Sequence, residues 1–135
     1  MLSSDAMISL TLFFFLVMVS FFYISQMSVT AWDSADLLNA ARDQATVLEK
    51  SGALASAVQQ GSSGEMLVVL NSTPGVFCFE VTVFGSSNFY DPEIHVIKSG
   101  CTKSYSTMVS SERSFAVRDG AQVSFYVARV DGWFK

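Results

Sequence analysis

Residues 1–24 read MLSSDAMISLTLFFFLVMVSFFYI, and this stretch decides how the rest of the chain is interpreted. No charged residue occurs between Ala6 and Ile24. At about 1.5 Å per residue in a helix, that run is about 28 Å long, close to the thickness of a bilayer's hydrocarbon core. We therefore predict a membrane-competent helix. A cleaved secretory signal is the alternative, but this stretch lacks the basic residues and the small-residue cleavage site that such a signal carries.

The composition of the whole chain excludes several classes of protein. Its 135 residues give room for one domain with an additional element, not for two cores. The net charge of -4 and the pI of about 4.7 argue against a nucleic-acid partner, which would need a basic surface. Hydrophobic residues make up 50% of the chain and charged residues 15%, and the apolar excess is concentrated before residue 25.

Beyond Ile24 the sequence becomes amphipathic. Apolar residues recur at spacings of three and four, which is typical of one buried face of a helix. These residues are Trp32, Ala35, Leu38, Ala41, Ala45 and Leu48. Ser51-Gly52 is expected to end or bend the helix, and residues 53–60 to resume it before the breaker GSSG at 61–64. We predict a helical region over residues 1–60, with a membrane or filament-core segment at 1–25 and an amphipathic extension at 26–60.

The remainder, residues 65–135, has the pattern of an extracellular β domain. Runs rich in Val, Phe, Tyr and Thr alternate with turn residues. They predict strands at 66–70, 76–84, 94–98, 101–109, 114–118 and 122–130. Asp119-Gly120 predicts a tight hairpin turn. The expected fold class is α+β, with a long N-terminal hydrophobic and amphipathic helix followed by a small antiparallel β-sandwich or barrel-like domain.

The chain has two cysteines, Cys78 and Cys101, and both lie in predicted strands of that domain. In an exported domain with a thin core, a disulfide between them is the natural prediction. Two buried free thiols are the alternative. A metal site is not favoured, because the pair lacks Cys or His companions.

Few residues have the arrangement that catalysis or cofactor binding needs. Asp91, Glu93 and His95 alternate and could share one face of a strand, so a divalent metal site is an alternative to solvated surface charges. No phosphate-binding glycine loop and no zinc spacing occur in the sequence. We therefore expect no enzymatic activity, no metal site and no cofactor. Asn71-Ser72-Thr73 is an N-glycosylation sequon in a predicted surface turn, so Asn71 is a candidate glycan acceptor.

The opening MLSSD resembles the start of mature archaeal type IV pilins, a family related to archaellins, whose leader is cut just before a Q-x-S-x-E stretch. Met1, Ser3 and Asp5 stand at the Gln, Ser and Glu positions of that pattern. The resemblance covers these first residues and the general order of a long helix and a β domain. It implies that the basic residues of the precursor lie in a removed leader and that Met1 begins the mature chain.

The resemblance further implies a structural protein that is anchored in the membrane and cleaved by a prepilin peptidase. Pilus assembly machinery would then build it into a helical homopolymer at the cell surface. Met1, Ser3 and Asp5 would set assembly and axial register, with Asp5 pairing the α-amino group of the same or a neighbouring subunit. The expected filament core is apolar: Leu10, Phe13, Phe14, Phe15, Leu16, Val17, Phe21 and Phe22.

Several alternatives remain open at the level of sequence. Adhesion is the expected use of the filament because the β domain is small, and an archaellin-type motility filament is the alternative. A single-span membrane protein whose extracellular β domain binds a ligand is the competing class. Asp5 could also simply stabilise the helix N-terminus, where a carboxylate is favoured.

Overall fold

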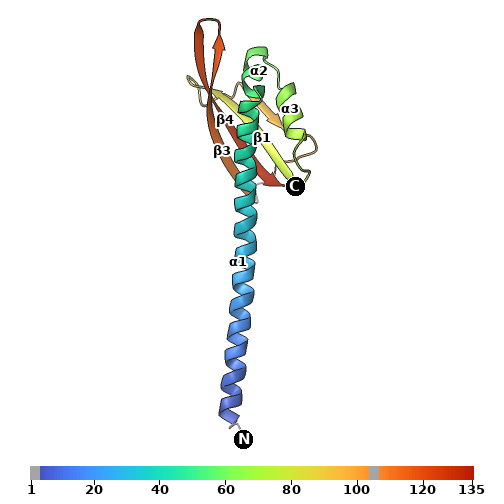
Figure 1. Ribbon diagram of the computed structural model, residues 1–135, viewed down its shortest axis with the longest axis vertical. Coiled ribbons are helices and arrows are strands. Elements are labelled where there is room, and N and C mark those ends of the chain that lie inside the picture. Colours follow the sequence, from blue (N-terminus) through green and yellow to red (C-terminus); the bar gives the residue numbers. More distant parts are fainter. Residues whose placement is uncertain (1–3, 104–106) are drawn as a thin grey trace. The chain divides into compact units, whose positions relative to one another are not determined.

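The computed structural model describes residues 4–103 and 107–135, and for residues 4, 5 and 26–32 it describes the backbone alone. Within these residues, three helices precede four strands (Figure 1). The helices are α1 Ser4–Lys50, α2 Ala53–Gln60 and α3 Gly64–Asn71. The strands are β1 Phe77–Gly85, β2 Ile94–Ile97, β3 Met108–Asp119 and β4 Gln122–Phe134. The predicted α+β class is thereby confirmed. The chain divides into two compact units, Met1–Ser34 and Ala35–Lys135.

The helical part of the prediction agrees with the structure, including the break. α1 ends at Lys50, and α2 begins at Ala53 after Gly52, which has a φ of 79°. That left-handed conformation is readily available to glycine alone, so Gly52 is the residue that turns the chain between the two helices. Gly61 ends α2 in the same conformation, with a φ of 62°.

In the second unit all strands join one antiparallel sheet in the order β2-β1-β4-β3. β3 and β4 form a long hairpin in which Asp119 faces Gln122, and Gly120 between them has a φ of 59°. A glycine with positive φ at the first central position suits a two-residue hairpin turn. The turn predicted at Asp119-Gly120 is thus confirmed.

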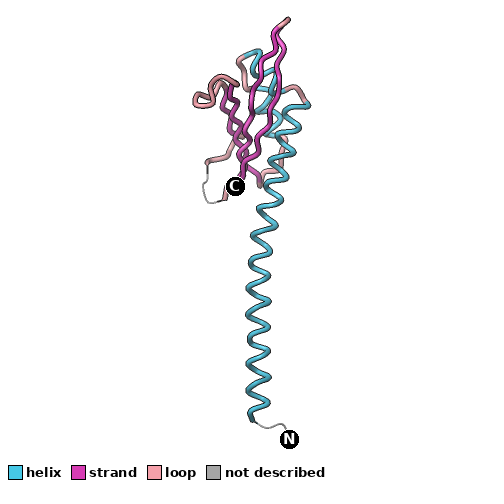
Figure 2. Tube along the Cα trace, turned by 90° about the vertical axis from the view of Figure 1, so that its left-hand side faces the viewer, coloured by secondary structure: helices cyan, strands magenta, loops and turns pink. Residues whose placement is uncertain are grey.

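Helices rather than a second sheet cover the strands of this unit, and they lie on one side of the sheet (Figure 2). The second layer of the domain therefore consists of the end of α1 together with α2 and α3. Where the sequence predicted a small antiparallel β-sandwich or barrel-like domain, the structure has one four-stranded antiparallel sheet covered by helices. The buried core between the layers is apolar: Leu37, Ala41, Ala45, Leu48, Leu54, Ala57, Met66, Leu70, Phe79, Val81, Val83, Val96, Phe115, Val117, Ala128 and Val130.

Small residues allow α1 to lie close to the sheet. Ala41 and Ala45 are fully buried on the helix, as the apolar periodicity predicted, but the chain buries Leu37 where the sequence pattern had placed Leu38. Leu37 lies beside Gly132 of β4, where an added Cβ would be 3.0 Å from the Phe79 ring and 3.6 Å from Leu37. A side chain at 132 would require the Phe79 ring to shift by a few tenths of an ångström, so close packing rather than backbone conformation favours glycine there.

Of the predicted strands, 66–70 is wrong, and 101–109 is wrong over its first three residues, while its residues 104–106 lie outside the described residues. Residues 66–70 belong to helix α3, where Met66 and Leu70, one turn apart, are both fully buried. The β-branched pair Val68-Val69 favours a strand locally, but burial of the i, i+4 pair against the domain core outweighs that preference. Residues 101–103 form a loop, because Cys101 is bonded to Cys78 and the loop crosses the sheet. Strand β3 therefore begins only at Met108.

Candidate functional site

The first candidate site is the apolar surface of α1 in the first unit. Residues Ala6–Ser25 have a mean hydropathy of 2.4 and form the one helix, among the described residues, that is long and apolar enough to cross a membrane. None of that segment is buried. Phe15 and Phe21, for example, are 68% and 74% exposed. A surface of this kind requires a cover of lipid or protein.

The apolar residues surround this helix completely. Phe13, Phe14 and Phe15 follow one another about 100° apart around the axis, so they cannot share one stripe. A helix that is apolar on all sides is buried in a large core or in a membrane. The Thr11 hydroxyl donates to the Met7 carbonyl at 2.7 Å, and the Ser25 hydroxyl to the Phe22 carbonyl at 2.9 Å. These two polar groups are therefore satisfied without water.

The residues predicted to form the filament core all lie on this surface and are exposed in the single chain: Leu10, Phe13, Phe14, Phe15, Leu16, Val17, Phe21 and Phe22. Of the residues assigned to assembly and register, Met1 and Ser3 lie outside the described residues. Asp5 lies in the first turn of α1, and its side chain is outside the description. The register role of these three residues stays a prediction.

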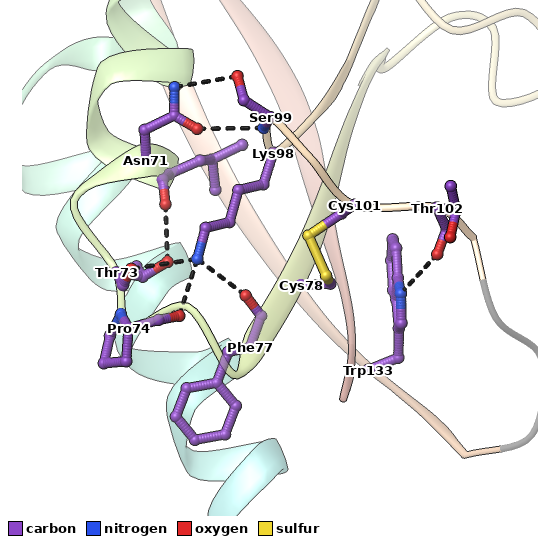
Figure 3. Close-up of a disulfide and its surroundings, with 11 residues drawn as sticks. Asn71, Thr73, Pro74, Phe77, Cys78, Lys98, Ser99, Cys101, Thr102 and Trp133 are labelled. Carbon is purple, nitrogen blue, oxygen red and sulfur yellow. Dashed lines mark hydrogen bonds between the residues drawn. A yellow bond between two sulfur atoms is a disulfide. The ribbon is translucent and has the colours of Figure 1, made fainter. Parts of the chain in front are cut away.

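The second candidate site is the disulfide between Cys78 of β1 and Cys101, which confirms the predicted bridge. It fixes the loop after β2 to the face of the sheet opposite the helices. Trp133 of β4 faces Cys78 across the strands and is buried, and its indole N–H donates to the Thr102 carbonyl at 2.9 Å (Figure 3). The bridge and the indole together hold this loop on the sheet.

Opening the bridge should destabilise the domain without unfolding α1. The two cysteines are 23 positions apart, and closing a loop of that size is worth about 3 kcal/mol in the chain-entropy model. We expect Cys78→Ser/Cys101→Ser to lower the free energy of unfolding in denaturant by about that amount. Intact-mass analysis of the native protein should change by two hydrogens on reduction; an unchanged mass would contradict the bridge.

A buried cation lies beside the disulfide. The Lys98 ammonium donates to the carbonyls of Thr73, Pro74 and Phe77 at 3.1, 2.8 and 2.9 Å (Figure 3). Burial lowers the pKa of Lys98, and the charge of Lys135 lowers it further. Three carbonyls nevertheless provide one acceptor for each ammonium hydrogen. Lys98 thus ties the chain after α3 to the start of β1.

Asn71, the predicted glycan acceptor, is exposed at the end of α3. Its side-chain Nδ2 donates to the Ser99 hydroxyl at 3.2 Å, and its Oδ1 accepts from the Ser99 backbone N–H at 3.1 Å (Figure 3). An N-linked glycan would replace one of the two Nδ2 hydrogens and leave the other for Ser99. Glycosylation at Asn71 stays a prediction.

A buried carboxylate, Glu80, organises the same face of the sheet. It forms ion pairs with His95 of β2 and with Lys103, whose Nζ lies 2.7 Å from Glu80 Oε2. His95 is thus directed to Glu80, and no group of three metal-ligating side chains occurs within residues 4–103 and 107–135. Asp91 and Glu93 lie in the loop between β1 and β2. This arrangement indicates that His95 takes part in an ion-pair network with Glu80.

The stability of the domain should depend on the ionisation of Glu80. Burial raises its pKa, but hydrogen bonds and charge from Lys103 and His95 lower it by more, so the pKa lies below the usual 4.5. The ion pair therefore stabilises the fold above about pH 4.5 and is lost as the pH falls through the lower, folded-state pKa. The advantage of the native protein over Glu80→Gln in denaturant unfolding should shrink as the pH is lowered from 5 to about 3. A difference that does not change with pH would contradict this.

Lys98, Glu80 and Trp133 are not among the site residues predicted from the sequence. For Lys98, the partners lie more than twenty residues earlier in the chain, and they are backbone carbonyls that no side-chain pattern reveals. For Glu80, the signal was present: it is a lone carboxylate in the otherwise apolar run VFCFEVTVF, which predicts a buried partner.

Comparisons of the chain with family models, with curated proteins and with solved structures return no match. Its function must therefore be inferred from its own features. The apolar helix indicates a membrane anchor or a signal. The disulfide indicates an extracellular environment for the domain, because such bonds form and persist where conditions are oxidising.

Proposed function

We propose that this protein is a structural subunit of an extracellular type IV pilus-like filament that serves attachment to surfaces. The segment Ala6–Ser25 anchors the subunit in the membrane before assembly and forms the filament core afterwards. The observation that carries the proposal is that this segment is apolar on all sides and entirely uncovered. The subunit has no catalytic role in this proposal and needs no cofactor.

A filament resolves the problem that an uncovered apolar helix creates. Outside lipid, the helix can be shielded from water only by protein, and the second unit uses its own apolar residues for its own core. Copies of the same helix provide the missing cover. Each phenylalanine that moves out of water contributes about 1.5–3 kcal/mol, so several per subunit make such a bundle strongly cohesive. Ala6, Ser9 and Ser20 allow neighbouring helices to approach closely.

Shearing of cells that produce the protein tests the proposal. We expect the sheared fraction to contain long filaments composed of this one chain, and the membrane fraction to contain the unassembled subunit. N-terminal sequencing of both against the open reading frame should locate a leader-cleavage site. Protein that is found only in membranes, and that detergent releases as monomers, would instead support a single-span protein whose extracellular domain binds a ligand.

The effect of losing the filament on the attachment of cells to surfaces should then be measured. Cells without the gene should adhere less to surfaces and swim normally if the filament serves adhesion. Loss of swimming with unchanged adhesion would identify the archaellin-type alternative.

A further inference from the structure

Four large apolar side chains are exposed at one end of the sheet in the second unit. Two lie on β4 near the hairpin turn, and two lie in the loop 86–93 between β1 and β2. They are Val123, Phe125, Phe89 and Tyr90, which are 52%, 61%, 57% and 99% exposed. Both views place this loop beside the β3–β4 hairpin (Figures 1 and 2). We call these four side chains the hairpin-end surface.

Hydrogen bonds hold the two parts of the hairpin-end surface in place. Ser86 N–H donates to the Phe125 carbonyl at 3.1 Å and so joins the loop to the hairpin. Within the loop, Asn88 N–H donates to the Gly85 carbonyl at 3.2 Å, and Tyr90 N–H donates to Asn88 Oδ1 at 3.2 Å. The backbone that carries these side chains is therefore already ordered, which lowers the entropy that binding costs.

The hairpin-end surface lies away from the point at which α1 enters the second unit. Leu37, near the start of this unit, lies beside Gly132 near the end of β4. Farther along the helices, Gln59 Nε2 donates to the Arg118 carbonyl, next to the hairpin turn, at 3.1 Å. The tip of the hairpin extends past the helices (Figures 1 and 2). The helical layer therefore leaves this surface uncovered.

The area of the surface limits the kind of partner that it fits. A fully enclosed aromatic side chain buries about 150–250 Å², so the exposed parts of the three rings and Val123 offer about 500 Å². A stable protein complex buries about 800 Å² on each partner, so this surface alone is too small for one. It is nevertheless among the larger apolar patches of single proteins, which measure about 300–600 Å² and often have a function.

The charges and the shape of this end also limit the partner. The exposed charges around the surface have both signs, with the cations Arg118 and Arg129 and the anions Asp91, Glu93, Glu112 and Asp119. A strongly charged partner of one sign is therefore not favoured. A pocket of about 180 Å³ lies at the start of β1 instead, at the opposite end of that strand. A projecting apolar surface with mixed charges fits an extended, uncharged apolar plane.

We propose that the protein adheres through the hairpin-end surface to extended, uncharged apolar material. The inference rests on the proposed function in attachment, and it adds the contact site and the chemical class of the surface. Burial of apolar side chains is non-directional, so a plane needs no matching pocket. Each copy buries little area and binds weakly. A filament presents the same surface on many copies, however, and simultaneous contacts multiply the strength of attachment.

Adhesion of cells under flow tests the inference. Cells that produce equal amounts of the full-length protein are placed on coatings of alkane chains that end in methyl groups or in hydroxyl groups. Cells with the native protein should be retained on the methyl coating and washed off the hydroxyl coating. Phe125→Ser/Tyr90→Ser should reduce the number retained on the methyl coating about tenfold or more, because every copy loses its contact. Equal retention of the native protein and this variant would overturn the inference.

Two control variants separate the site from general effects. Val68→Ser/Val76→Ser also removes two exposed apolar side chains, but they lie on α3 and before β1, so adhesion should not change. Phe125→Leu/Tyr90→Phe keeps the apolar area and should adhere like the native protein. The mass shift on reduction shows that each variant retains its disulfide. Tyr90→Ser alone changes a fully exposed residue and should cause part of the loss. Equal loss in both double serine variants would contradict the site.

Counting filaments on the same cells separates this inference from the proposed filament. Normal filaments with unchanged adhesion of Phe125→Ser/Tyr90→Ser would overturn the contact and leave the filament standing. Adhesion that depends on these two residues in cells without filaments would keep the contact and overturn the filament.

Two further conditions identify the class of surface. Adhesion should persist in about 0.5 M NaCl, because salt screens charges but does not weaken apolar contacts. Retention that salt abolishes would identify a charged partner, and retention on a polysaccharide coating alone would identify a sugar. Either result would overturn the inference.

Discussion

Replacing Phe14 by Lys is expected to abolish filaments while leaving the disulfide-bonded domain folded. Phe14 is 59% exposed in the single chain and lies in the middle of the uncovered segment, so the substitution removes no contact from the core of the second unit. In a bundle of apolar helices, however, the ammonium has neither water nor a carboxylate partner. A lysine at the centre of a membrane helix costs about 3 kcal/mol or more, and in a filament every subunit bears this cost.

The measurement is the yield of sheared filaments from cells that produce equal amounts of subunit. Phe14→Leu is the matched control and should assemble, because leucine remains apolar. The domain itself can be monitored by the mass shift on reduction, which reports its disulfide. Filaments of normal yield and length from Phe14→Lys would show that the segment does not form the filament core.

Replacing Trp133 by Ala should have the largest effect on the stability of the second unit. The side chain is 1% exposed and lies against the loop that the disulfide fixes. Large-to-small substitutions of a buried tryptophan cost about 3–5 kcal/mol. The loss also leaves the Thr102 carbonyl without the indole donor that lies 2.9 Å away. The total free energy of unfolding of such a domain is about 5–15 kcal/mol, so the substitution would remove a large part of it.

Denaturant unfolding of the full-length protein in detergent, followed by near-ultraviolet circular dichroism, measures this effect. Trp133→Phe retains a buried aromatic ring but removes the N–H donor together with the five-membered ring, so it loses less buried volume than Trp133→Ala. We expect it to cost about 1–2 kcal/mol, clearly less than the Ala variant. Equal unfolding midpoints for the native and Trp133→Ala proteins would show that this region does not contribute to stability.

The parts of the fold that the sequence predicted are those with local causes. The length of the apolar run, the helix break at Gly52 and the hairpin at Gly120 each depend on residues next to one another in the chain. The disulfide was predictable because the chain has only two cysteines. Helix α3 was missed because its eight residues contain a β-branched pair, and its Ser63 N-cap makes no side-chain hydrogen bond that a sequence pattern would reveal.

The candidate sites divide in the same way. The apolar surface of α1 can be predicted from composition alone, because folding of the single chain does not bury it. The pocket at the start of β1 cannot be predicted in this way, because it combines α1 with two segments more than twenty-five residues later in the chain. The Lys98 site needs backbone carbonyls that only the folded chain brings together.

The strand order β2-β1-β4-β3 has a consequence for the proposed filament, in which many copies of the domain would lie side by side. Such a sheet has two open edges, and each offers unpaired backbone groups to a strand of a neighbouring molecule. On one side the border strand β2 is only four residues long. On the other, β3 is long but carries Glu112, Arg113 and Arg118, and Arg113 is paired with Glu49 of α1. Both edges therefore resist lateral strand addition, so that neighbouring domains can crowd together without fusing into a continuous, irreversible β-aggregate.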